Sequence, residues 1–166
     1  MVTPGLAAPP DEEALKAAYT LNFPKFIEWS NSPQNSLQIC LVGDTRVTKL
    51  LNDAAGSDIA GRTLKTRRVQ LPGQVEGCHV LYIAELEANR LRRSLAALAE
   101  SPILTVSDLP GFVSAGGMIG LIRDGSRLRF EIDLKPMRRV GLLAEAKLIR
   151  LAVRVYYGGA VDRNPQ

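Results

Sequence analysis

The sequence contains very little histidine or cysteine, with one His and two Cys among 166 residues. A zinc site built from four Cys and His ligands is therefore excluded. No apolar run approaches the length of about 18 residues that a membrane-spanning helix needs, so we expect no such helix. Aromatic residues make up only 5% of the chain, which leaves few side chains to stack on nucleic-acid bases.

What is present is the composition of an ordinary globular domain, with 46% hydrophobic and 23% charged residues. The charge is unevenly distributed, because residues 1–60 carry four basic and seven acidic side chains while residues 61–166 carry seventeen and ten. A basic half can indicate nucleic-acid binding. These basic residues are scattered over predicted helices and strand edges, so a solvated basic surface is the simpler interpretation. We expect no nucleic-acid partner.

The alternation of apolar patterns predicts an α/β fold, as a single compact domain over residues 11–157 between a flexible segment (1–10) and a flexible tail (158–166). Its sheet is expected to be mixed and mostly parallel, with helices on both faces and a C-terminal β-hairpin plus helix. Strands are predicted over 36–43, 61–71, 78–84 and 102–107, and the hairpin over 118–123 and 127–134. Helices are predicted from Asp11 with a kink at Pro24, and over 45–55, 87–100 and 136–140.

The last helix is predicted over residues 144–155, since apolar residues recur there at helical spacing. The predicted buried stripe of this helix consists of Leu148, Leu151, Ala152 and Val155.

A glycine-rich loop over residues 108–120 follows the strand at 102–107 and contains Gly111, Gly116, Gly117 and Gly120. Glycines permit close backbone approach, and consecutive N–H groups can hold an anion. The loop matches neither the dinucleotide-binding nor the Walker pattern. Two interpretations stay open, a structural turn that positions the hairpin and a loop that binds a ligand or partner. In either case we expect Gly116 and Gly117 to be needed for backbone conformation.

Cys40 and Cys78 lie in two predicted core strands. A catalytic Cys–His pair is disfavoured, because thiols in apolar strands stay protonated and the side chains of Cys78 and His79 point to opposite faces. A disulfide is favoured, and two buried thiols are the remaining alternative. Glu131 and Asp133 are interpreted as part of a solvated strand face. The residues therefore predict no catalytic, metal-binding or cofactor-binding site.

Several blocks of the sequence resemble the YfiR/HmsC family. The most specific are ILTVSDLPGFVSAGGMIGLIRDGSRLRFEIDL over residues 103–134 and VGLLAEAKLIRLA over 140–152. KAAYTLNFPKFIEW over 16–29, LQICLVGD over 37–44, the pair Gly61-Arg62 and CHVLYIA over 78–84 match further blocks. The resemblance covers about residues 14–155.

This resemblance implies a non-enzymatic periplasmic regulator without a cofactor. It implies binding to the periplasmic sensor region of a YfiN-like membrane-bound diguanylate cyclase, whose repression lowers cyclic di-GMP and biofilm formation. It further implies a homodimer and a disulfide between Cys40 and Cys78. The chain shows no signal-peptide pattern at its start, so we expect it to begin at the mature protein. The alternative function is a small-ligand sensing module of the same fold that uses the 108–120 loop.

Candidate binding residues come from the glycine loop and from the basic last helix. Exposed apolar and arginine side chains often anchor protein interfaces, which is why Phe112 and the helix arginines are chosen. The predicted partner- or ligand-binding residues are Gly111, Phe112, Gly116, Gly117, Arg150 and Arg154.

Overall fold

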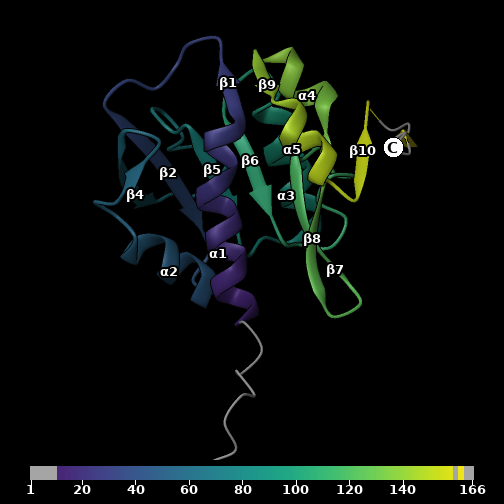
Figure 1. The fold of residues 1–166 in the computed structure, drawn as a ribbon, viewed down its shortest axis with the longest axis horizontal. Helices are drawn as coiled ribbons and strands as arrows, with labels where there is room; N and C mark the ends of the chain where they lie inside the picture. The colour runs from purple at the N-terminus through teal and green to yellow at the C-terminus, as the bar shows by residue number, and fades with distance from the viewer. Residues whose placement is uncertain (1–10, 159–160, 163–166) are drawn as a thin grey trace, which may run out of the picture.

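The computed structural model describes residues 11–158 and 161–162, in which a nine-stranded mixed sheet forms the centre (Figure 1). The order of its strands is β11-β10-β8-β7-β6-β5-β2-β4-β3. Their bounds are β2 (Ser36–Val42), β3 (Asp58–Ile59), β4 (Arg62–Arg68), β5 (Val80–Ile83), β6 (Leu104–Ser107), β7 (Ile119–Asp124), β8 (Arg127–Asp133), β10 (Arg154–Tyr156) and β11 (Val161–Asp162). A separate antiparallel pair joins β1 (Ile27–Trp29) to β9 (Leu142–Ala144).

The middle of the sheet is parallel, because β4, β2, β5, β6 and β7 all run in the same direction. The hairpin of β7 and β8 turns at residues 125–126 as predicted, and β10 then pairs in parallel with β8. The two outermost strands, β3 and β11, are antiparallel to their neighbours. The predicted mixed, mostly parallel α/β sheet is confirmed.

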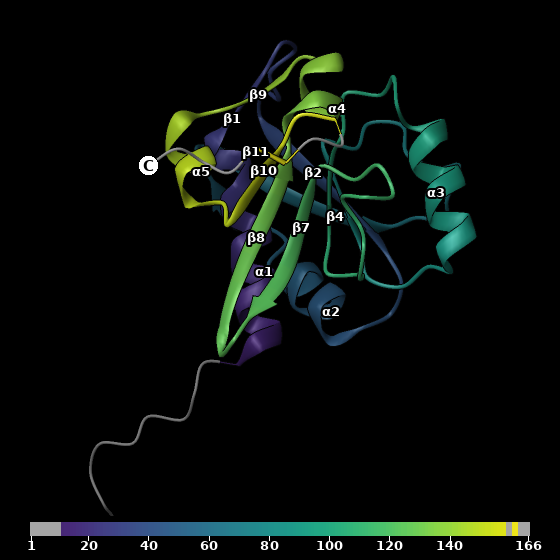
Figure 2. The same cartoon turned by 90° about the vertical axis from the view of Figure 1, so that its right-hand side faces the viewer.

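Helices cover both faces of the sheet, as predicted. On one face, α1 (Glu12–Asn22) and α2 (Arg46–Asp53) contact alternate residues of β2 and β5, such as Ile39 and Tyr82. On the other face, α3 (Ala88–Ala97) contacts the intervening residues, such as Cys40 and Leu81. Figure 2 shows α3 on the far side of the sheet from α1. Both faces of the central strands are therefore buried, which explains their continuous apolar runs.

The N-terminal helix ends earlier than the sequence suggests. Asp11 caps α1 by accepting the backbone N–H of Glu13, and the helix ends at Asn22. A 3₁₀ turn, η1 (Phe23–Phe26), follows in place of the predicted kink, because Pro24 cannot donate to the α-helical ladder but fits the first turn of a new helix. Phe23 is buried in the core. The strand β1 after it was not predicted.

The predicted last helix is wrong over much of its length. After α4 (Leu134–Arg139) and β9, the helix α5 covers only Ala146–Leu151, and β10 begins at Arg154. The backbone N–H of Val153 donates to the carbonyl of Phe130, so the free edge of β8 draws this segment into the sheet. The β-branched Val153 and Val155 favour that extended conformation. Leu151 is 55% exposed and does not belong to the core.

The predicted flexible ends lie mostly outside the described residues, namely 1–10, 159–160 and 163–166. Within the predicted tail, Val161–Asp162 forms β11 against β10, so this part of the tail is a strand.

Candidate functional site

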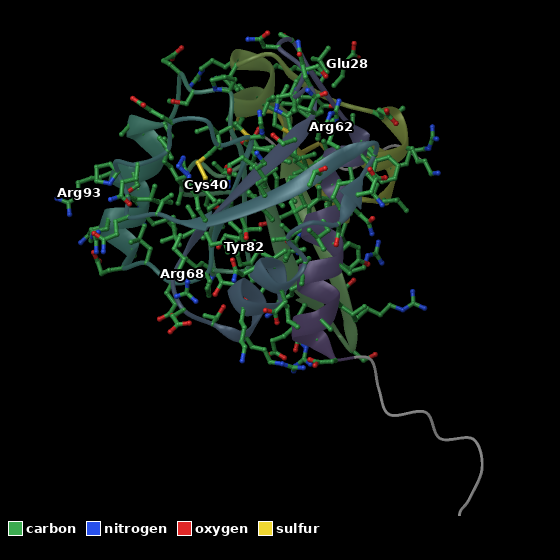
Figure 3. The ribbon with its side chains drawn as sticks, turned by 90° about the vertical axis from the view of Figure 1, so that its left-hand side faces the viewer. Glu28, Cys40, Arg62, Arg68, Tyr82 and Arg93 are labelled. Carbon is green, nitrogen blue, oxygen red and sulfur yellow. A yellow bond between two sulfur atoms is a disulfide. The ribbon has the colours of Figure 1, made fainter. Side chains whose placement is uncertain are left out.

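Cys40 and Cys78 form a disulfide that joins β2 to the segment just before β5, with their Cα atoms 5.9 Å apart. Figure 3 shows the bonded sulfur atoms in the interior, beside the sheet. Both sulfurs are consumed by this bond, so neither cysteine is a nucleophile. The arrangement confirms the disulfide and rejects the alternative of two buried thiols.

His79 has a structural role next to the disulfide. Its ring Nδ1 accepts the backbone N–H of Gln38 at 2.9 Å, and its own backbone N–H donates to the Gln38 carbonyl. Burial, with a smaller contribution from the Arg62 guanidinium, lowers the pKa of His79 below its ordinary value of 6.5. The imidazole is thus held neutral as a hydrogen-bond acceptor between β2 and β5.

This histidine predicts a pH dependence of stability. Because the pKa of His79 is lower in the folded protein, the unfolded chain takes up this proton at a higher pH than the folded protein does. The stability that the neutral imidazole contributes is therefore complete above pH 6.5 and is lost as the pH falls toward the folded-state pKa. Urea denaturation between about pH 7.5 and about pH 5.5 should show this decrease. His79→Asn keeps an acceptor near Nδ1 and should flatten the profile. An unchanged profile in that variant would assign the slope to other groups.

Tyr82 is the largest fully buried side chain of β5 and lies on the α1 face of the sheet (Figure 3). Its hydroxyl has no hydrogen-bond partner among the described residues. Burial raises the pKa of Tyr82, and the Asp108 carboxylate raises it further. The Asp108 carboxylate itself accepts from Lys16 of α1 at 2.8 Å. Tyr82 therefore stays a neutral phenol, unsuited to act as a base or nucleophile.

The glycine loop satisfies its own backbone. The N–H groups of Ala115, Gly116 and Gly117 donate to the carbonyls of Gly111, Val113 and Phe112 at 2.9–3.0 Å. Gly111 and Gly116 adopt left-handed conformations with φ of 71° and 114°, which L side chains disfavour. Since these N–H groups are already paired, the loop is not an anion cradle. The geometry favours a structural turn, one of the two interpretations left open by the sequence.

Phe112 is a core residue rather than a surface contact. Its side chain is 1% exposed and belongs to the buried apolar cluster between the sheet and α3. A Cβ atom on Gly117 would lie within 3.0 Å of three atoms of the Phe112 ring. The prediction of an exposed surface around Phe112 is wrong, because the loop folds its aromatic side chain under itself. The need for glycine at 117 comes from this close approach.

A cavity of about 360 Å³ lies between α3, the loop and α4. Of the four loop residues predicted to bind a partner or ligand, only Gly116 lines this cavity, beside the apolar Leu95 and Met118. Its basic lining residues are Arg92, Lys135 and Arg139. Asp133 also lines this cavity; it is 7% exposed, and its carboxylate accepts the backbone N–H groups of Lys135 and Gly158. The interpretation of Asp133 as part of a solvated face is therefore wrong.

Arg150 and Arg154 lie away from this cavity. Arg150 is exposed on α5, whereas Arg154 is on β10 and pairs with Glu131 at 3.5 Å. Tyr156 donates its hydroxyl to the same Glu131 carboxylate. The six predicted binding residues are thus not gathered into one site.

A larger groove, of about 660 Å³, runs between α1, the outer edge of β8 and the end of α5. Sequence reasoning missed it. Its apolar lining residues are Leu15, Tyr19, Leu128, Phe130 and Leu151. Its charged lining residues are Glu12, Arg123, Arg127 and Arg129. The one available signal was the alternation of arginine with apolar residues along 127–130. That pattern does not indicate which other segments of the chain lie beside the strand.

Neither a metal site nor a membrane-spanning helix finds support in residues 11–158 and 161–162. No three His, Cys, Asp or Glu side chains in this part of the chain are placed to hold a metal ion. Its helices are also too short or too polar to cross a membrane.

Comparison with known families is decisive, because a protein-family model described as YfiR/HmsC-like matches residues 13–153. The chain belongs to the YfiR/HmsC-like family. The match extends from α1 to the residue before β10, so it includes the disulfide, the glycine loop and the groove beside β8. YfiR/HmsC-like proteins are periplasmic regulators without catalysis. A disulfide buried in the sheet agrees with an oxidising compartment.

Proposed function

We propose that this chain is a periplasmic repressor of a YfiN-like membrane diguanylate cyclase, which it binds through the cyclase's periplasmic sensor region. The observation that carries the proposal is the family match over residues 13–153. Repression lowers cyclic di-GMP and, with it, biofilm formation. The bonded cysteines cannot act as nucleophiles, which agrees with a role in binding.

Repression by such a protein is a shift of equilibrium. A binding protein silences a sensor if its affinity for the inactive state exceeds its affinity for the active state. Inhibition should then follow the stoichiometry of the complex and require no turnover. The protein is proposed to act as a homodimer, which light scattering of the purified protein would establish. Arg150 and Arg154 remain proposed contacts.

The test is a titration of the purified protein against a full-length YfiN-like diguanylate cyclase of the same organism, in membranes. Production of cyclic di-GMP is expected to fall until protein and sensor are equimolar and then to level off. Heat-denatured protein serves as the control for nonspecific effects. Unchanged cyclase output at saturating, folded protein would contradict the proposed function.

A second candidate, the small-ligand sensing module, is favoured by the cavity beside Gly116. Arg92, Lys135 and Arg139 would attract an anion there, over an apolar floor. This candidate predicts that a small organic anion such as citrate raises the melting temperature and that Arg92→Gln together with Arg139→Gln removes the rise. An equal rise in that double variant would contradict it.

A further inference from the structure

The groove beside β8 contains an unpaired strand edge. β7 pairs with β8 from Arg127 to Ile132, but on the other side β10 pairs only with Glu131–Asp133. In the part of the chain that the structure describes, residues 127–130 therefore have no strand on the side away from β7. Figure 2 shows this part of β8 extending past β10 toward the hairpin tip. Such an edge is a template for one more strand.

The backbone of β8 points polar groups into this groove. The carbonyl of Leu128 accepts the Tyr19 hydroxyl at 3.3 Å, and the carbonyl of Phe130 accepts the N–H of Val153 at 2.8 Å. Both donors come from the side away from β7, so both carbonyls point there. In an antiparallel strand the N–H of a residue points to the same side as its carbonyl. Leu128 and Phe130 therefore present their N–H groups toward the groove, and the Leu128 carbonyl keeps a second lone pair.

The side chains around this edge define what kind of strand would fit. On the α1 side, Leu15, Tyr19 and the 55%-exposed Leu151 offer apolar surface. Arg123 is paired with Glu12 at 3.2 Å. Arg127 and Arg129 have no carboxylate within 4.0 Å among the described side chains of residues 11–158, although they line the groove. The groove thus combines an apolar wall with unneutralised positive charge.

We propose that this groove binds an extended, acidic segment of a partner protein, which adds to the edge of β8 as a further strand. Because side chains alternate along a strand, apolar residues of that segment would face Leu15, Tyr19 and Leu151, and its carboxylates would face Arg127 and Arg129. A second copy of this chain is a poor occupant, since edge-to-edge pairing of two β8 strands brings these arginines together. The identity of this segment rests on the proposed function, under which it belongs to the sensor region of the cyclase.

The first experiment tests the groove without the cyclase. A short peptide of alternating glutamate and valine is titrated into isotopically labelled protein, and amide resonances and hydrogen exchange are followed by NMR. The amides of Leu128 and Phe130 are expected to shift and to exchange more slowly, whereas a peptide of alternating lysine and valine should leave them unchanged. Arg127→Glu with Arg129→Glu should reverse this preference. Absence of any response at these amides to the glutamate peptide overturns the proposal.

The second experiment uses the periplasmic region of the cyclase as the ligand. Arg127→Glu with Arg129→Glu, and separately Leu151→Asp, should each weaken binding by roughly tenfold or more. Arg93→Glu, a single charge reversal on α3 (Figure 3), should bind like the parent. Circular dichroism verifies that each variant is folded. If both groove variants bind the cyclase region as tightly as the parent protein does, the groove is not the binding site for the cyclase. If the parent protein binds the glutamate peptide but not the cyclase region, the proposed function is wrong while the groove proposal stands.

Discussion

Removing the disulfide by the double substitution Cys40→Ala and Cys78→Ala is expected to lower the free energy of unfolding by about 4 kcal/mol. The bond closes a loop with a sequence separation of 38 residues, and the loss of this constraint enlarges the unfolded ensemble. Cys40 is fully buried and Cys78 is 6% exposed, so the substitutions also remove a small amount of core contact. Urea denaturation of parent and variant measures the difference.

Two controls separate the covalent constraint from the change of side chains. The parent protein under reducing conditions should lose most of the same stability, and Cys40→Ala alone should behave like the double variant. If oxidised and reduced parent protein unfold at the same urea concentration, the disulfide contributes little to stability.

Gly117→Ala is expected to destabilise the protein by about 1–3 kcal/mol, the usual effect of inserting atoms into a filled core. The added methyl group would overlap the ring of Phe112, which is buried beneath the loop and has little room to move. Gly73→Ala is the matched control, since a Cβ atom at that position would have no other atom within 4 Å and the φ of Gly73 is outside the left-handed region. Differential scanning calorimetry of the two variants compares them directly.

The cause of this effect can be checked by a second substitution. Phe112→Leu in the Gly117→Ala background should recover part of the lost stability, because the smaller side chain leaves space for the methyl group. Equal melting temperatures of Gly117→Ala and Gly73→Ala would show that the loop tolerates the overlap by shifting.

The elements that the sequence predicted well have local causes. The strand at 36–43 contains the apolar run of residues 39–42, and the hairpin has a turn sequence, Asp124-Gly125-Ser126, between two alternating segments. The segment after α5 has no such local cause. Its buried residues Leu148, Ala152 and Val155 fit helical spacing, yet the strand β10 forms because β8 offers backbone partners from far away in the chain. Non-local pairing of this kind cannot be read from periodicity.

The candidate site was predicted less well for a related reason. Composition and motifs identify residue types but not exposure, so Phe112 was placed on the surface and Leu151 in the core, and the structure has them the other way round. The groove beside β8 combines residues from α1, β8 and α5, which are separated by more than a hundred positions between Tyr19 and Leu128. Only the topology brings these segments together.

The disulfide has a consequence that follows from strand order. Strands β2, β3 and β4 come from the first part of the chain and lie together at one end of the nine-stranded sheet, while its later strands, β5 to β8, β10 and β11, lie on the other side of the β2–β5 boundary. The bond between Cys40 and Cys78 crosses that boundary. Each half can therefore form its own pairings from nearby sequence before the halves dock. Once the bond forms, the two halves are covalently tethered across this seam, so sub-global opening there is expected to be rarer than in the reduced protein.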